Sequence, residues 1–332
     1  MEQYENKKNN KNMKIYKSLL IILFSVFLAN VGTSQKLLQS IDEQYQNIGE
    51  QYAKKYFAPL TTGIGVIMGS GFIGGYSPQE YKKVLISPHI YIGMKYCGVV
   101  KTEDESTFNF NFKSHMNYMG ISVPVIWSVK NAPTIFGNTN PAIASGTFYF
   151  NGQKKDTVVK LIGGSGTSSL TPLYIPHIGI GTFLGTDFII RGFPGFNIGS
   201  YGRLTIYGGA IRHNFSTYIK MPFDVSLQGG FQHLYINNSD YRFMTGNSYF
   251  FNIQFNKRFS FLSVYAGTQI EGYNIDVNYE YDGIKLPFTQ KSDNPFRALL
   301  GLTFSLGPVK INSDISYGEK FSFSGGIGMG LY

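Results

Sequence analysis

The sequence predicts an all-β fold, a transmembrane antiparallel β-barrel of about 14 strands (roughly 12 to 16) with an N-terminal helix, since bacterial barrels prefer even strand numbers. Three observations lead to this prediction. Strand-length segments alternate apolar with polar or small residues, charged residues are scarce, and the chain begins with a basic stretch and an apolar run typical of a signal peptide. Together they favour a barrel whose outer face meets lipid.

The last 37 residues show the alternation most clearly. Three strands are expected there, over 297–306, 309–317 and 321–331. In the first of them, one face carries Ala298, Leu300, Leu302, Phe304 and Leu306. Because neighbouring residues of a strand point to opposite faces, each strand has one apolar and one polar or small face. A closed barrel suits this pattern, because it satisfies every backbone group inside a bilayer.

Composition supports a membrane barrel over a soluble β-protein. Of the 332 residues, 16% are aromatic and 15% are charged, whereas soluble domains average about 25% charged. A soluble β-sandwich or a lipocalin-like barrel would also alternate, but its apolar faces need covering and its outer faces need charge. The net charge of +9 comes with no basic run or nucleic-acid motif, so no nucleic-acid partner is expected.

Residues 1–34 are predicted to be a signal peptide, outside the fold. The basic stretch ends at Lys17, and Leu19 to Ala29 form an apolar run too short to span a bilayer. Gly32 and Ser34 place small residues at the positions that precede cleavage before Gln35. A single membrane anchor is the alternative reading of this run.

Residues 35–60 are expected to form an N-terminal helical plug or a periplasmic segment. Apolar and aromatic residues recur there every three or four positions: Leu37, Ile41, Tyr45, Ile48, Tyr52 and Tyr56. This spacing predicts a helix over 36–58, ended by Pro59, Gly63 and Gly65. Such a helix could block the lumen or lie on the periplasmic rim.

Residues 61–332 are assigned to the barrel. In the first half, strands are expected within 62–73, 88–96, 108–113 and 119–127, and a loop-rich stretch over 130–170 includes short strands at 146–150 and 157–162. In the second half, 173–183 and 187–192 form a hairpin around Gly185, and further strands fall within 203–218, 223–235, 249–256 and 262–271. Tyr and Phe near strand ends predict aromatic girdles. Cys97 is the single cysteine, so no intramolecular disulfide is expected.

Several short motifs resemble a known group of proteins. They are the segments 176–181 (PHIGIG), 186–191 (TDFIIR), 207–213 (YGGAIRH) and 222–226 (PFDVS), with the turn at 133–137 (PTIFG) and the Gly-rich last strand. This set resembles an uncharacterised family of outer-membrane barrels, distantly similar to FadL-type transporters of hydrophobic compounds. The resemblance implies an N-terminal plug over 36–58, a 14-stranded barrel and passage of fatty acids or hydrocarbons through a lateral opening.

Candidate lumen residues are His177, Arg191, Arg212, His213 and Asp224. Arg212 and His213 are neighbours in one strand, so only one of them can face inward. If Leu204, Ile206 and Gly208 mark the lipid face, Arg212 reaches the headgroup level, where arginine can snorkel, and His213 points inward. The cluster would then bind carboxylates or gate the bore, or form a structural hydrogen-bond network.

No catalytic residue, metal or cofactor is predicted. Ser114 precedes His115, but adjacent strand residues face opposite ways, so the pair does not make a nucleophile with its base. The five histidines lack metal-ligand spacing.

The sequence therefore predicts a protein of the outer membrane of a Gram-negative bacterium, a monomer in contact with membrane lipids. Its expected activity is that of a channel or transporter for small hydrophobic or amphipathic molecules. The alternatives are a non-transporting structural barrel or membrane partner of a periplasmic or secreted assembly, and then a lipid-modifying enzyme.

Overall fold

The computed structural model describes residues 46–74, 86–161, 163–164, 170–197, 202–219, 221–238, 241–281 and 284–331. The predicted signal peptide and residues 35–45 lie outside the described residues. The described part consists of one α-helix, α2 (Gln46–Gly69), fifteen strands and two short 3-10 helices, η4 (Glu103–Ser106) and η6 (Phe215–Thr217). Among the described residues, no helix combines the length and the apolar character needed to cross a membrane.

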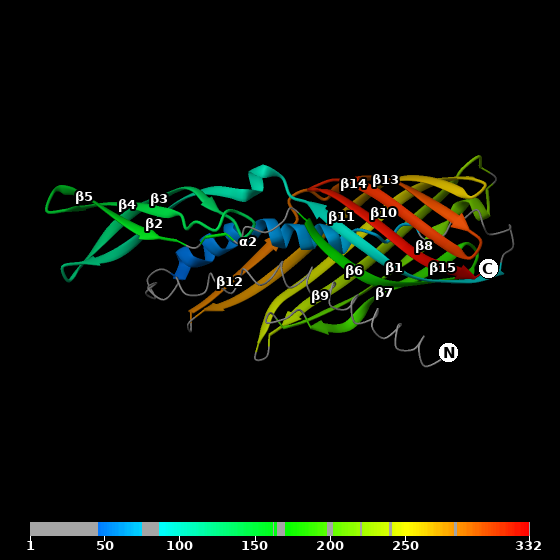
Figure 1. Cartoon of the computed structure of the whole chain (residues 1–332), viewed down its shortest axis with the longest axis horizontal. Coiled ribbons are helices and arrows are strands. Elements are labelled where there is room, and N and C mark those ends of the chain that lie inside the picture. Colours follow the sequence, from blue (N-terminus) through cyan, green and yellow to red (C-terminus); the bar gives the residue numbers. More distant parts are fainter. Residues whose placement is uncertain are drawn as a thin grey trace, which may run out of the picture.

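Ten antiparallel strands close into a barrel (Figure 1). They are β1 (Ile86–Val100), β6 (Leu170–Phe183), β7 (Thr186–Asn197), β8 (Arg203–Asn214), β9 (Asp224–Asn237), β10 (Arg242–Phe259), β11 (Leu262–Tyr281), β13 (Phe296–Leu306), β14 (Val309–Tyr317) and β15 (Phe321–Leu331). The first strand pairs with the last, and β10 pairs with β11 over its whole length. Within the described residues, each wall strand thus has a partner on both sides.

The remaining strands lie beyond the barrel wall. β2 (Thr107–Tyr118), β3 (Ile121–Pro133), β4 (Ile143–Phe150) and β5 (Gln153–Lys160) form a separate antiparallel sheet. β12 (Ile284–Lys291) pairs only with the far half of β11. We call the four-stranded sheet β2–β5 the cap. The prediction of about 14 barrel strands is therefore wrong: the barrel has ten, because the alternating segments between 107 and 160 cover α2 instead of facing lipid.

The outer face of the wall is apolar and the inner face is largely polar. On β13, Leu302 is 39% exposed, whereas its neighbour Thr303 is 2% exposed. The same alternation separates Phe231 from Gln232 on β9. It extends around the wall, with Ile92, Ile190, Ile211, Phe251, Ile270, Ile315 and Ile327 also pointing outward. Oily side chains outside and polar ones inside are the arrangement of a membrane-spanning barrel.

The two mouths of the barrel differ. At one, strands are joined by the tight turns Leu184-Gly185, Ser260-Phe261 and Gly307-Pro308. β1 also begins and β15 ends there, because Ile90 lies opposite Leu331. We call this the short-turn mouth. The opposite end, here called the cap mouth, carries the cap between β1 and β6 and the extensions of β9 to β12 (Figure 1).

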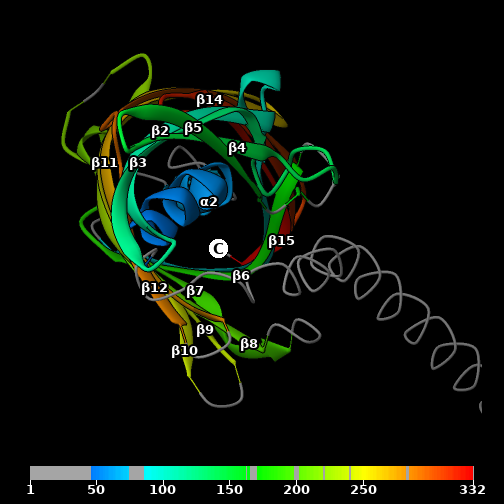
Figure 2. The same cartoon turned by 90° about the vertical axis from the view of Figure 1, so that its left-hand side faces the viewer.

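Helix α2 lies inside this frame (Figure 2). It begins under the cap, where the Tyr52 ring is 5.2 Å from that of Phe108, and runs into the bore to Gly69. The predicted strand over 62–73 is therefore wrong, and so is the predicted end of the helix at residue 58. Pro59 removes the donor that would bond Lys55 O, yet the helix continues ten residues beyond it to Gly69.

Gly65 explains why glycine does not end this helix. A Cβ at that position would lie 2.5 Å from the ring of Tyr273 on β11. The missing side chain therefore lets the helix backbone approach the barrel wall, which outweighs the modest cost of glycine within a helix.

Candidate functional site

The C-terminal end of α2 is held by side chains of the barrel wall. The last carbonyls of a helix lack intrahelical donors and carry the negative end of its dipole. Here two buried arginines supply donors from different strands, Arg191 on β7 and Arg297 on β13. We call the set of contacts around residues 66–73 the plug lock.

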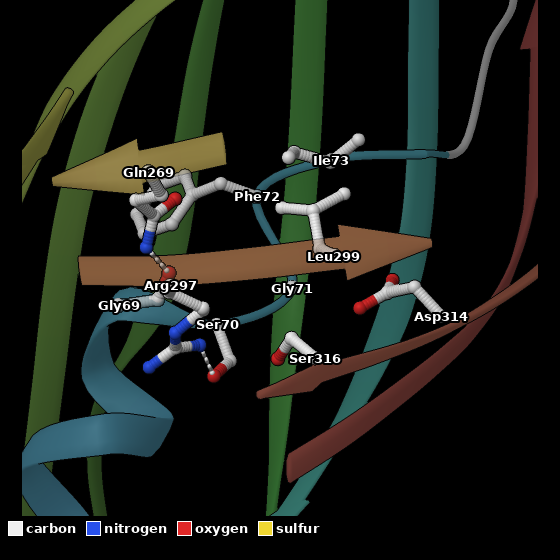
Figure 3. Close-up of a pocket in the computed structure, with 10 residues that line it drawn as sticks. All are labelled: Gly69, Ser70, Gly71, Phe72, Ile73, Gln269, Arg297, Leu299, Asp314 and Ser316. Atoms are coloured by element: carbon white, nitrogen blue, oxygen red, sulfur yellow. Dashed lines mark hydrogen bonds between the residues drawn. The ribbon is translucent and has the colours of Figure 1, made fainter. Parts of the chain in front are cut away.

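Arg297 joins the helix to an acidic partner. It donates from Nη2 to Val66 O at 2.8 Å and from Nη1 to the Ser70 hydroxyl. It also makes an ion pair with Glu271 of β11, with Nη2 to Oε1 at 2.6 Å and Nε to Oε1 at 3.1 Å. Gln269 completes this side by donating to Gly69 O at 3.0 Å (Figure 3). A buried charge is thus neutralised where the helix ends.

Arg191 holds the next residues. Its guanidinium donates to Met68 O at 2.7 Å and to Ser70 O at 2.5 Å, and Nε donates to the Gln232 amide oxygen. The same guanidinium lies 3.5 Å from the centre of the Phe72 ring, a cation–π contact that is strong when desolvated. Arg191 and Arg297, on opposite sides of the barrel, therefore bind the same turn of backbone.

After the helix, residues 70–74 form bends inside the barrel. Gly71 has a φ of +73°, and a Cβ there would lie 2.5 Å from Cys97 Sγ, so only glycine fits without strain. Lys95 Nζ donates to Ile73 O at 2.7 Å and to Asn312 at 2.5 Å. A small pocket beside this segment is lined by Gly69, Ser70, Gly71, Phe72, Ile73, Gln269, Arg297, Leu299, Asp314 and Ser316 (Figure 3).

Towards the cap mouth, the interior is apolar instead of polar. One buried cluster joins Tyr52, Tyr56, Phe57 and Leu60 of α2 to wall and cap side chains. The wall contributes Leu173, Ile175, Leu204, Ile206, Leu234, Ile236, Met244, Ile275, Val277 and Phe288, and the cap contributes Phe110, Val125 and Trp127. We call this the outer compartment. Burial raises the pKa of the Tyr52 phenol, so that hydroxyl stays neutral.

The wall has a seam beside the outer compartment. β6 and β7 pair only from His177 opposite Arg191 down to Phe183 opposite Thr186. Among the described residues, no backbone pairing joins 170–176 of β6 to 192–197 of β7, because the former continue along β1 and the latter along β8. The strands part where prolines interrupt them: Pro172 and Pro176 in β6 and Pro194 in β7. Proline removes a ladder donor and suits a free edge.

Aromatic and apolar side chains rim this seam. Tyr174 on β6 is 41% exposed, and Ile190 and Phe196 on β7 are 59% and 38% exposed. Behind them lie Leu173 and Ile175 of the outer compartment. The β6–β7 seam is therefore an edge with apolar groups on both its lipid side and its lumen side.

The structure places four of the five sequence-predicted site residues inside the barrel. His177, Arg191, Arg212 and Asp224 are buried there, and His177 and Arg191 lie opposite each other in neighbouring strands. Arg212 makes an ion pair with Asp187, Nη2 to Oδ2 at 2.6 Å, and His89 Nε2 lies 3.3 Å from the other carboxylate oxygen. The lumen cluster thus divides into the plug lock at Arg191 and a second group nearer the short-turn mouth.

The facing predicted for Arg212 and His213 was wrong. Arg212 points into the barrel, whereas His213 lies half-buried on the outward face, with its ring 5.0 Å from Phe215. The error arose because Leu204 and Ile206 were expected to face lipid. They are buried inside, since the outer compartment is apolar. An apolar side chain can face either lipid or a helix in the lumen, so its apolar character alone does not give its direction.

Five residues of these buried networks were not predicted as site residues. Four belong to the plug lock, Arg297, Glu271, Gln269 and Lys95, and the fifth is Asp187, which pairs with Arg212. Alternation does place Gln269 and Glu271 on the inward face, which was the available signal. Within the described ranges, no group of three His, Cys, Asp or Glu could hold a metal ion.

Comparisons with known proteins give a family and several distant structural likenesses. The sequence model of "Family of unknown function (DUF6588)" matches residues 13–331, and the comparison with curated proteins finds no match. Solved structures that are similar include OmpT with loop L8 deleted, an outer membrane protein of Vibrio cholerae (10% identity, 75% of this chain and 100% of that chain, TM-score 0.27).

Two others are the β domain of the Bordetella autotransporter BrkA (10% identity, 75% and 100%, TM-score 0.29) and the Ralstonia pickettii toluene transporter TbuX (10% identity, 80% and 96%, TM-score 0.28). TM-scores this low carry no inference about activity. The expected membership of an uncharacterised family is confirmed, and the closed antiparallel barrel agrees with the fold expected of it.

Proposed function

As the chain belongs to the family of unknown function DUF6588, we propose from its geometry that it is an outer-membrane barrel that passes small hydrophobic or amphipathic molecules. The route is the outer compartment and the β6–β7 seam, and α2 is the plug that must shift to open it. The seam carries this proposal: it joins an apolar interior to the lipid-facing surface at the place where the strands lack mutual hydrogen bonds. An apolar solute could cross there without entering water.

The plug sets the condition for passage. Side chains of α2 fill the outer compartment, and its end is fixed by the plug lock. A molecule can therefore enter only if α2 yields part of that apolar volume. Burial of apolar surface contributes about 25 cal/mol per Å², so a hydrophobic solute could replace some of the contacts that the helix loses.

Closing the seam tests the proposal. In a Cys97→Ser background, Tyr174→Cys and Phe196→Cys are joined by a bismaleimide linker, and uptake of the hydrophobic fluorophore N-phenyl-1-naphthylamine is followed in cells. Uptake is expected to fall to the level of cells lacking the protein. The matched control is Ile178→Cys with Ile190→Cys, an outward-facing row that is already paired, where linking should leave uptake unchanged.

Equal uptake with the seam open and closed would exclude the lateral route. Absence of uptake and of ion conductance, even after deletion of residues 36–58, would exclude transport altogether. The non-transporting alternative is favoured by one observation, the cap, which exposes large apolar side chains such as Met119 (78%), Tyr149 (66%) and Val158 (69%). A barrel that binds a partner through its cap would retain that binding after the seam is linked.

A further inference from the structure

The course of α2 through the barrel has a single direction. Its first turns lie at the cap mouth, where Ile135 N donates to Tyr56 O at 3.0 Å and the Tyr56 hydroxyl donates to Gly163 O at 3.1 Å. The Phe57 ring lies 6.1 Å from Phe288 of β12, an extension at the same mouth. The beginning of the helix is therefore outside the ring of ten strands, under the cap (Figures 1 and 2).

The other end of α2 lies within the bore. Residues 66–73 are held by the plug lock, and the wall begins with β1 at the short-turn mouth, where Ile90 faces Leu331. From Gln46 to Gly74 the chain thus runs from the cap mouth into the bore, and β1 then begins at the short-turn mouth.

The two mouths can be assigned to the two sides of the membrane. Outer-membrane barrels have short periplasmic turns and longer extracellular segments. The turns at 184–185, 260–261 and 307–308 are short and only the link 215–223 is longer among the described connections at this mouth, whereas the opposite mouth carries the cap and the extensions of β9 to β12. This places the cap mouth at the cell surface.

We infer that the barrel exposes the first turns of α2 at the cell surface. This inference is separate from transport, since it rests on the direction of α2 and on the orientation of the barrel, and not on the seam. The start of α2 offers exposed polar side chains there, Gln51, Lys54 and Lys55.

Labelling from outside the cell tests the inference. Single-cysteine variants of the full chain in a Cys97→Ser background are treated with a membrane-impermeant maleimide, first in intact cells and then after permeabilisation. Lys54→Cys reports α2, Asn117→Cys reports the cap and Pro308→Cys reports a short turn; all three positions are exposed. Intact cells are expected to label Lys54→Cys and Asn117→Cys, and Pro308→Cys only after permeabilisation.

Two results would overturn the inference. If Asn117→Cys is labelled in intact cells but Lys54→Cys is not, α2 does not begin at the surface. If Pro308→Cys is labelled and the other two are not, the barrel has the opposite orientation and the first turns of α2 face the periplasm. Gln51→Cys serves as a second reporter should Lys54→Cys fail to fold.

Discussion

Arg297 shows how one side chain can connect a plug to its barrel. It neutralises Glu271, a wall carboxylate, and at the same time satisfies a carbonyl at the end of α2. Burying a charged pair costs desolvation energy that the mutual attraction does not always offset, but removal of one partner leaves the other charge buried and unpaired. The residue therefore contributes to both the stability and the closure of the barrel, and the two roles can be separated.

We expect Arg297→Met to lower the free energy of unfolding by about 3–5 kcal/mol, because Glu271 is left without its partner. The double variant Arg297→Met with Glu271→Leu should recover most of that loss. It should nevertheless conduct ions more than the unmodified protein, since the end of α2 loses both bonds from Arg297 and keeps only the internal bond from the Ser70 hydroxyl to Val66 O at 2.7 Å. Urea titration in lipid vesicles and single-channel recording measure the two effects. A double variant as closed as the unmodified barrel would mean that Arg297 does not hold the helix.

Glu319 in the β14–β15 turn should make stability depend on pH. Partial burial raises the pKa of its carboxyl above 4.5, although the Tyr273 hydroxyl donates to it at 2.9 Å. The folded state then keeps a proton that the unfolded state has lost. Stability from this group is thus fully present below pH 4.5 and is lost as pH rises through the folded pKa.

Glu319→Gln should remove this component, so that urea midpoints vary less with pH above 4.5. Glu50→Gln, on the first turns of α2, is the matched control and should keep the slope of the unmodified protein. An unchanged slope in Glu319→Gln would show that other groups dominate in that range.

At the scale of elements, the length of α2 is set by its surroundings and not by the local sequence signals for a helix end. Pro59, Gly63 and Gly65 predict its end near residue 58, yet it continues to Gly69. Most helix stability in proteins comes from packing and not from propensity. The last turns of α2 lie within the barrel, and the glycine at 65 serves as a contact surface for Tyr273.

Gly65→Ala should therefore destabilise the plug even though alanine is the better helix former. The added methyl would meet the Tyr273 ring, and overpacking costs about 1–3 kcal/mol. We expect a lower urea midpoint and more frequent channel openings. Gly229→Ala is the control, because the nearest atom to its Cβ would be 3.6 Å away. Increased stability of Gly65→Ala would show that the helix does not press on this wall.

The sequence predicted elements better than it predicted their assembly. Alternation correctly separated lipid-facing from lumen-facing residues in β9, β10, β11 and β13, because a period of two depends only on neighbours. It could not tell that the apolar face of 107–160 covers a helix. For the site, Arg297 donates to a carbonyl 231 residues earlier in the chain, and no local pattern encodes such a pairing.

At the scale of the whole molecule, the cap, the plug and the barrel are separable parts. Val100 and Leu170 lie directly opposite each other in β1 and β6, so the wall is already continuous where the cap departs from it. The cap packs on α2 through Phe108 and Phe110. The barrel should therefore close without the cap, whereas the plug should not stay fully covered.

Replacement of residues 101–169 by Asn-Gly tests this division, since that pair suits a two-residue hairpin turn. The variant is expected to insert and to keep heat-modifiable migration on gels, because all ten wall strands remain. It should also bind more of the dye ANS and show noisier conductance, because Tyr52 and Tyr56 lose their cover. A variant that does not insert would show that the cap is needed for barrel formation.

The position of Trp127 has a practical consequence. It is the chain's sole tryptophan, lies 1% exposed on the helix-facing side of β3, and donates from Nε1 to the Ser114 hydroxyl at 2.8 Å. Its ultraviolet emission therefore originates from one known site, and wetting of that site would shift the spectrum to the red. In the purified protein, Trp127 fluorescence thus reports, without any attached dye, whether water reaches the buried face of the cap.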